Sequence, residues 1–200
     1  AALQAQQMPH YTQYMFNDFV INPAIAGVYD YYQIRTNHRF QWVGLLDPPM
    51  TNSIAFYGPH ANLDMGYGGY VYHDVTGPTS RTGVTGSYAY NIAISGDMRL
   101  SMGLYASVMQ YRIDGTQLNP ADVSDPAILN MVSTSYLPDA GIGLYLYAEK
   151  FYAGLSLAQL LNNNIKIFDD NDGVNRLKTH IHLTGAYRFW LDQDWLIEPS

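Results

Sequence analysis

The chain has 200 residues, of which 10 are Lys or Arg and 17 are Asp or Glu, giving a net charge of -7. This acidic balance argues against nucleic-acid binding, which depends on Lys and Arg neutralising phosphates. No segment approaches the roughly 18 to 20 consecutive apolar residues that a membrane helix needs, and the absence of cysteine excludes disulfides, thiol nucleophiles and Cys-based zinc sites.

The N-terminal part of the chain has no strand-like alternation. Residues 1–5 resemble the small-residue end of a secretory signal peptide, so we expect a signal-peptide remnant there and a mature terminus at Gln6. Residues 6–28 carry turn formers, among them Asn22, Pro23 and Gly27. The pattern predicts an irregular periplasmic lead-in or plug over 6–28, followed by a single β-barrel domain over 29–200.

Apolar residues occupy every second position in the segment from Met98 to Ile113, which predicts a strand with two different faces. Its length suits a tilted membrane crossing, which takes roughly 9 to 11 residues plus the interfacial ends. A ninth strand is expected to begin at Trp195. The complete strands predicted in chain order are Asp30 to Val43, Thr51 to Tyr57, Leu63 to Asp74, Arg81 to Ile94, Met98 to Ile113, Asp139 to Ala148, Phe151 to Leu160 and Leu177 to Trp190.

The two faces of these strands indicate which side meets lipid. If the apolar face meets lipid, the inner face is polar and rich in glycine, which is the reverse of a soluble barrel. The 18 tyrosines favour this interpretation, because amphipathic rings concentrate at bilayer interfaces. The opposite facing would describe a Tyr-rich, lipocalin-like soluble barrel. The residues predicted to face the lumen include Arg35, Asn37, Arg99, Tyr105, Tyr145 and Arg188.

The connections alternate in length. The predicted links after the second, fourth, sixth and eighth strands are short, whereas the others are mostly longer, and the fifth runs from Asp114 to Pro138. Outer-membrane barrels have short periplasmic turns and longer extracellular loops. The sequence therefore predicts an all-β, antiparallel, transmembrane outer-membrane β-barrel with its N-terminus in the periplasm and its longer loops outside.

Three other constellations are weak. Asp169 to Asp172 gathers oxygen ligands as a calcium loop does, but the segment lacks the EF-hand register, and whether it binds calcium stays open. His180 and His182 share one strand face without an evident third metal ligand. Ser53, Ser101 and Ser156 have no nucleophile-elbow context. We therefore assign no catalytic, metal or cofactor-binding residue and expect no cofactor.

Three runs of residues near the start of the chain form a pattern: Tyr11 to Asn17, then Ile21 to Gly27, which contains Asn22-Pro23-Ala24, and then Arg39 to Gly44, which contains Gln41 and Trp42. These runs resemble the opening signature of the PorP/SprF family, outer-membrane proteins of the type IX secretion and gliding system. The signature residues, with a structural or a partner-contacting role, are Asn22, Pro23, Ala24, Gly27, Arg39, Gln41 and Trp42. The resemblance implies a larger, even-stranded barrel, so we expect this chain to be a fragment with eight complete strands, truncated at its C-terminus.

The resemblance also implies a function and partners. The expected function is non-enzymatic: the protein helps to export or surface-anchor secreted proteins such as gliding adhesins. The implied partners are the lipid bilayer, a secreted surface protein or adhesin, and other type IX secretion components. A general diffusion porin is the first alternative, because a polar lumen is sufficient for it, and an outer-membrane enzyme is the second.

Overall fold

The computed structural model of the chain describes residues 17–44, 47–117, 132–163, 177–192 and 195–197. Among these residues, no helix is long and apolar enough to cross a membrane.

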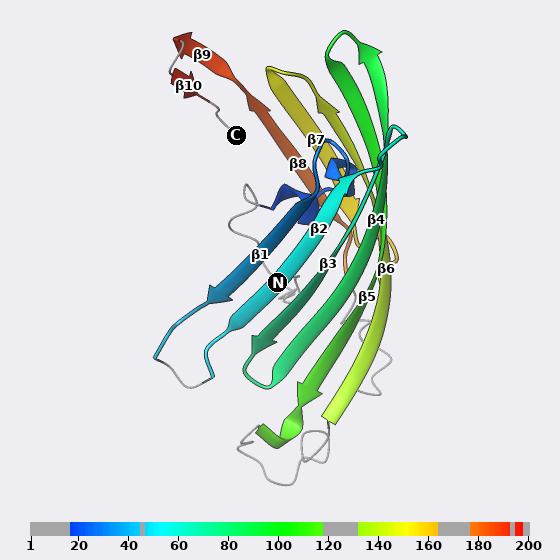
Figure 1. Ribbon diagram of the computed structural model, residues 1–200. Coiled ribbons are helices and arrows are strands. Elements are labelled where there is room, and N and C mark those ends of the chain that lie inside the picture. The colour runs from blue at the N-terminus through cyan, green and yellow to red at the C-terminus, as the bar shows by residue number, and fades with distance from the viewer. Residues whose placement is uncertain (1–16, 45–46, 118–131, 164–176, 193–194, 198–200) are drawn as a thin grey trace, which may run out of the picture.

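Eight antiparallel strands follow one another in chain order and form a single sheet. The sheet curls into a half-barrel whose edges are β1 and β8 (Figure 1). This confirms the all-β antiparallel class predicted from the sequence. The strands are β1 (Gln33–Phe40), β2 (Met50–Pro59), β3 (Met65–Thr76), β4 (Thr79–Ser95), β5 (Met98–Asp114), β6 (Val132–Tyr147), β7 (Phe151–Ala158) and β8 (His180–Tyr187).

The long central strands are paired along almost their whole length. The pairing of β4 with β5 runs from Thr79 opposite Ile113 to Ser95 opposite Met98, and β5 pairs with β6 over an equally long register. Glycines with a positive φ occupy the tight connections on both sides of β4, at Gly77 and Gly96, since this conformation is open to glycine without a steric penalty. The chain therefore returns directly into the neighbouring strand.

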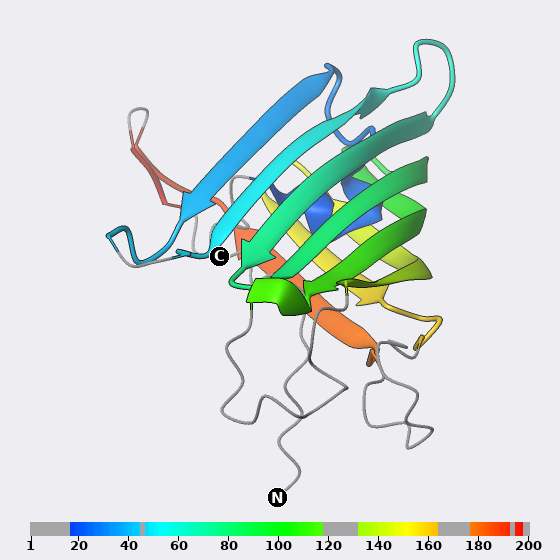
Figure 2. The ribbon, with the colours of Figure 1, turned by 90° about the horizontal axis from the view of Figure 1, so that it is seen from below.

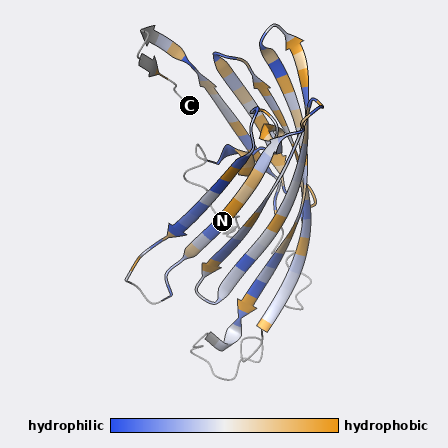
Figure 3. Ribbon diagram, viewed as in Figure 1, coloured by the Kyte–Doolittle hydropathy of each residue, from blue (hydrophilic) through white to orange (hydrophobic). Residues whose placement is uncertain are grey.

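The two faces of the sheet differ in exposure. On β5, Ser101 and Gly103 are buried, whereas Met102 and Leu104 are exposed. This alternation follows from the strand geometry, which directs successive side chains to opposite faces. The strands accordingly alternate between hydrophobic and hydrophilic residues in Figure 3.

The predicted strand boundaries agree with the structure to within a few residues except in two strands. The strand β6 begins at Val132 rather than Asp139, because a run of Ser, Thr and Tyr continues the pairing with β5. The predicted link from Asp114 to Pro138 is therefore shorter, and it begins with the 3-10 helix η4 (Gly115–Gln117). The predicted strand from Leu177 to Trp190 is interrupted at Arg188.

The residues after Arg188 leave the main sheet. The strand β9 (Phe189–Asp192) pairs with β10 (Trp195–Ile197) in a separate two-stranded sheet. A strand therefore begins at Trp195 as predicted. It pairs with Phe189 and Trp190, the last residues of the predicted eighth strand, but this pairing lies outside the curled sheet.

Residues 17–28, the described part of the predicted segment 6–28 and called the lead-in here, lie inside the curl of the sheet. They contain two 3-10 helices, η2 (Asp18–Val20) and η3 (Pro23–Ile25). Figure 2 shows these helices, in blue, enclosed by the strands. The buried core consists mainly of apolar residues of the lead-in and of inward-facing aromatic and aliphatic side chains of the sheet.

Candidate functional site

The local sequence of the lead-in determines its compact shape. The side-chain oxygen of Asn22 accepts a hydrogen bond from the Ala24 N–H at 3.0 Å, which caps η3. Pro23 occupies the first helical position, where its missing N–H costs nothing. Gly27, with a φ of 79°, then turns the chain toward β1.

Side chains of the sheet hold the backbone of the lead-in. Ser101 donates to the carbonyl of Ala24 at 2.5 Å, and Ser156 donates to the carbonyl of Ile21 at 2.8 Å. Asn91 donates to the carbonyl of Gly27 at 2.9 Å. These three donors come from β4, β5 and β7, so the lead-in is attached across the width of the half-barrel.

Asn22 also donates a hydrogen bond from its side chain to the sheet. Its side-chain nitrogen donates to the carbonyl of Leu144 on β6 at 3.0 Å. The residue is 2% exposed. A single buried amide thus caps η3 and joins the lead-in to the sheet.

Two strand glycines make the close approach possible. A Cβ atom at Gly103 would overlap the backbone of Ala24, and one at Gly143 would overlap the side-chain oxygen of Asn22. The inward face of β5 and β6 therefore accommodates the lead-in only because these positions lack a side chain. Ala24 is completely buried as a result.

Aromatic rings anchor the first turn of the lead-in. The ring of Phe19 stacks on Tyr57 with centroids 4.5 Å apart and meets Tyr70 edge-on at 6.4 Å. On the other side of the half-barrel, Tyr145 stacks on Tyr152 at 5.4 Å. The tyrosines thus line the inside of the sheet as well as its exposed face, and composition alone does not separate these two populations.

A polar cluster flanks the lead-in at the β1 edge. Arg35 donates to the side-chain oxygen of Gln33 from two nitrogens, at 2.6 and 3.1 Å, and the Tyr57 hydroxyl donates to the same oxygen at 3.2 Å. Burial raises the pKa of the nearby Asp18 carboxyl above its ordinary value of 3.8, while backbone hydrogen bonds and the charge of Arg35 oppose this shift. The lead-in therefore holds a carboxylate whose charge burial disfavours.

The residues predicted to face the lumen lie in several places. Arg35 and Asn37 are half-buried and alternate with exposed residues along β1, and Tyr145 is 5% exposed against the lead-in. Arg99 lies near the β4–β5 turn, where it pairs with Asp64 at 2.8 Å. Arg188, at the end of β8, donates to the carbonyl of Glu149.

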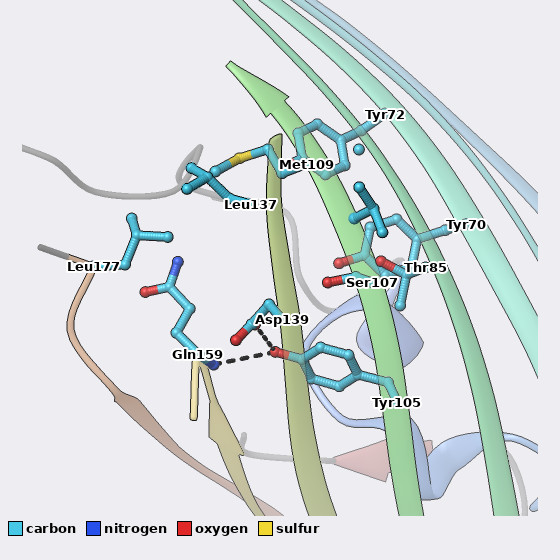
Figure 4. Close-up of a pocket in the computed structure, with 12 residues that line it drawn as sticks. Tyr70, Tyr72, Thr85, Tyr105, Ser107, Met109, Leu137, Asp139, Gln159 and Leu177 are labelled. Atoms are coloured by element: carbon cyan, nitrogen blue, oxygen red, sulfur yellow. Dashed lines mark hydrogen bonds between the residues drawn. The ribbon is translucent and has the colours of Figure 1, made fainter. Parts of the chain in front are cut away.

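Tyr105, the remaining residue of that prediction, belongs to a second cluster. Its hydroxyl donates to Asp139 at 2.7 Å and accepts from the backbone N–H of Gln159 at 3.1 Å (Figure 4). The cavity beside this cluster has a volume of about 20 Å³, and Tyr70, Met109 and Leu137 line it. This volume suits a single water molecule.

The signature residues separate into two groups. Asn22, Pro23 and Ala24 are buried within the lead-in, and Gly27 follows them. In contrast, Arg39, Gln41 and Trp42 lie at the opposite end of β1, where the Gln41 N–H donates to the carbonyl of Pro49 at 3.0 Å and Trp42 is 69% exposed.

Sequence reasoning missed the residues that hold the lead-in. The sequence predicts no structural role for Ser101 and Ser156 beyond their place on a strand face, and it does not single out Asn91. The available signal was their place on the polar face of strands whose other face is apolar. However, no local pattern indicates which backbone carbonyl such a side chain meets.

The structure gives little support to the two metal sites considered from the sequence. His180 and His182 lie on the inward face of β8 with their rings 6.2 Å apart. Within the described part of the chain, no three His, Asp or Glu side chains gather as a metal site would require. The stretch from Asp169 to Asp172 lies outside the described residues.

The fold and the lead-in define a class of protein: an antiparallel curled sheet with a largely apolar exposed face and a segment of its own chain seated in its concave face. The sequence matches the family described as type IX secretion system membrane protein PorP/SprF over residues 3–200. Because this match covers nearly the whole chain, the protein belongs to the PorP/SprF family, as its signature residues predicted. Comparison with curated proteins and with solved structures gives no match.

Proposed function

We propose that this protein is a non-enzymatic outer-membrane component of type IX secretion that helps to export or surface-anchor secreted proteins such as gliding adhesins. The family consists of membrane proteins of that secretion system. This membership supports two parts of the proposal, the assignment to type IX secretion and the location in a membrane. The exposed apolar face of the sheet supports contact with lipid, because large side chains such as Leu104, Ile142 and Leu183 are each at least half exposed.

The observation that carries this proposal is the occupied concave face. Phe19, Asn22 and Ala24 are each at most 2% exposed, and their segment is bound through side chains of several strands. A general diffusion porin instead leaves a water-filled channel. The occupied concave face favours a scaffold over a porin, and a scaffold needs no catalytic group.

The proposed orientation follows from the connections. The connections 60–64, 96–97 and 148–150 join strands at one end of the half-barrel, and the longer connections 41–49, 115–131 and 159–179 join strands at the other end. The β3–β4 turn at this second end is an exception to the predicted alternation, because it consists only of Gly77 and Pro78. We assign the first end to the periplasm and the second to the cell surface, following the usual pattern of such barrels. The surface loops would then offer the docking area for a secreted protein.

Co-purification tests this role. The full-length, affinity-tagged protein is extracted from its native outer membrane in mild detergent, and its companions are identified by mass spectrometry. Recovery of a secreted surface protein or of other type IX components, absent from a control barrel of similar abundance, is the expected result.

A clean preparation that conducts ions in planar bilayers would overturn this proposal in favour of the porin. A variant with Asn22→Ala provides a further comparison. If the lead-in serves partner contact as well as packing, this variant should lose companions while remaining in the membrane.

A further inference from the structure

The outward face of β4, β5 and β6 divides into two zones along the strands. The outward positions within 84–94 of β4, 100–108 of β5 and 138–146 of β6 are occupied only by apolar, aromatic or glycine residues. We call this zone the apolar band. It extends to the short turns, where Ile94 is 51% exposed.

Beyond the band, toward the longer connections, the next two outward positions of each strand carry a hydroxyl, amide or guanidinium group, and the outward position after them on β6 is Val132. Three of them, Thr82, Gln110 and Tyr136, lie side by side in register, and the next row consists of Ser80, Arg112 and Thr134. We call these six residues the polar rim.

Side chains at the start of the rim satisfy one another across strands. Gln110 donates to the Tyr136 hydroxyl at 2.9 Å, and the His73 ring of β3 lies 2.8 Å from the Thr82 hydroxyl. Such pairing is what polar groups at the limit of hydrocarbon require, because lipid offers them no partner. Arg112 is further out, 3.9 Å from Asp114, and carries a charge that the bilayer interior would not tolerate.

The lengths of the strands agree with this division. The strands β4 and β5 have 17 residues each, and β6 has 16. Crossing the hydrocarbon takes about 9 to 11 residues at the usual tilt. Each of the three strands is therefore about six residues longer than a crossing needs. Most of this surplus lies at the end that carries the polar rim, over 79–83 of β4, 109–114 of β5 and 132–137 of β6.

We propose that bilayer hydrocarbon covers the apolar band and stops near the row formed by Thr82, Gln110 and Tyr136, within the slope of that row. The outer ends of β4, β5 and β6 then project into the headgroups and water as a wall on the side of the longer loops. This inference deepens the proposed function, on which it rests for the membrane and its orientation. It also gives the surface loops a raised, rigid base.

The depth of each position is best compared along one strand. Rows of paired residues run perpendicular to the strands, so in a sheet tilted by about 40° they slope relative to the membrane plane. Over three neighbouring strands this slope amounts to about two residues, given a strand spacing of about 4.8 Å. Positions four residues apart on a single strand avoid the problem.

Nitroxide labelling measures these depths directly. The chain has no cysteine, so Leu104→Cys, Val108→Cys and Arg112→Cys can each be labelled singly in the full-length protein in liposomes. Collision of the label with oxygen reports hydrocarbon, and collision with a water-soluble nickel complex reports water. The ratio of oxygen to nickel collisions should stay above one at Leu104 and Val108 and fall below one at Arg112.

Matched positions on β6 guard against a variant that fails to fold. Ile142→Cys should behave like Leu104→Cys, and Thr134→Cys like Arg112→Cys. Oxygen-dominated collisions at both Arg112 and Thr134 would overturn the proposed projection of the strand ends, because the hydrocarbon would then cover them. Nickel-dominated collisions at Leu104 and Ile142 would overturn the apolar band as a lipid surface. Neither result depends on which proteins co-purify, so this inference and the secretion role can fail separately.

Discussion

At the scale of single residues, Asn22 has the most demanding environment in the lead-in. One amide accepts from Ala24 and donates to Leu144, in a place with almost no solvent. A buried amide satisfied in both directions fixes the distance between two backbones, since neither carbonyl nor N–H finds water as a substitute.

Replacing Asn22 with Ala should therefore destabilise the protein. The Leu144 carbonyl loses its side-chain donor and η3 loses its cap, at a cost of about 1–3 kcal/mol. Urea unfolding in detergent micelles, followed by tryptophan fluorescence, measures this difference. Asn62→Ala, at an exposed turn position, is the matched control and should stay within about 0.5 kcal/mol of the parent. Equal losses for both variants would contradict the role assigned to Asn22.

Gly103 offers a second test at a single position. Gly103→Ala should cost about 1–3 kcal/mol of unfolding free energy, because the added methyl group overlaps the backbone of Ala24. Gly86→Ala is the control, since a Cβ atom there meets nothing within 4 Å. The sharper measurement repeats Gly103→Ala in a protein without residues 17–28, where the substitution should become harmless. An undiminished loss in that background would show that the lead-in is not the cause.

The burial of Asp18 predicts that the stability of the protein depends on pH. Its pKa is raised by burial, so the folded protein binds this proton more tightly than the unfolded chain does. The ionised carboxylate therefore lowers stability at neutral pH, and the penalty disappears as pH falls through the raised pKa toward 3.8. Asp18→Asn should raise the unfolding midpoint at neutral pH and leave it unchanged well below 3.8, measured by thermal unfolding in micelles. The exposed Asp30→Asn is the control, and a gain from Asp18→Asn that persists in acid would refute this explanation.

At the scale of elements, β5 shows how one strand serves two environments. Its inward residues Ser101 and Gly103 receive the lead-in, whereas its outward residues Met102 and Leu104 are exposed. The two-residue period allows both tasks in the same stretch of chain, because neighbouring side chains never share a face.

This division predicts a depth-dependent cost of charge on β5. Leu104→Arg should destabilise the protein in liposomes by about 2–4 kcal/mol, because it places a charge near the bilayer midplane. Gln110→Arg, six positions along the same outward face in the polar rim, should cost less than about 1 kcal/mol. Folding into liposomes, followed by electrophoretic mobility without heating, measures both variants. Similar costs at the two sites would mean that the outward face of β5 does not meet lipid as proposed.

Elements also show where sequence patterns are ambiguous. The predicted strand from Met98 to Ile113 nearly coincides with β5, because both of its faces are chemically distinct along its length. The start of β6 was missed, since Ser133, Thr134 and Ser135 lack the apolar alternation on which the prediction relied. Their pairing with Tyr111, Arg112 and Ile113 depends on a strand that is distant in sequence.

At the scale of the whole molecule, the lead-in connects the start of the described chain to four consecutive strands that follow much later in the sequence. Its hydrogen bonds reach β4, β5, β6 and β7. The half-barrel is thus braced from inside, and its concave face is filled by the segment that precedes β1 (Figure 2). The same segment therefore contributes to the stability of the fold and covers its concave face.

That coupling predicts how the protein behaves as a channel. The full-length protein in planar bilayers should conduct little, because the lead-in occupies the concave face. A variant without residues 17–28 should conduct more, and adding Gly103→Ala to the otherwise intact chain should move conductance in the same direction. High conductance of the intact protein, unchanged by the deletion, would instead favour the porin.

The sequence by itself determined the strand periodicity, the absence of an apolar stretch long enough for a membrane helix, and the family, whose signature residues lie in order along the chain. All three properties are local, so they can be recognised without knowing which segments meet. Only the tertiary structure decided that Ser101, Ser156 and Asn91 bind the lead-in and that Gly103 and Gly143 make room for it. Contacts between residues 64 to 135 positions apart, as in these hydrogen bonds, depend on the curvature and register of the entire sheet. The alternation of side chains sets which face a residue occupies, but the packing of the whole chain sets what it touches there.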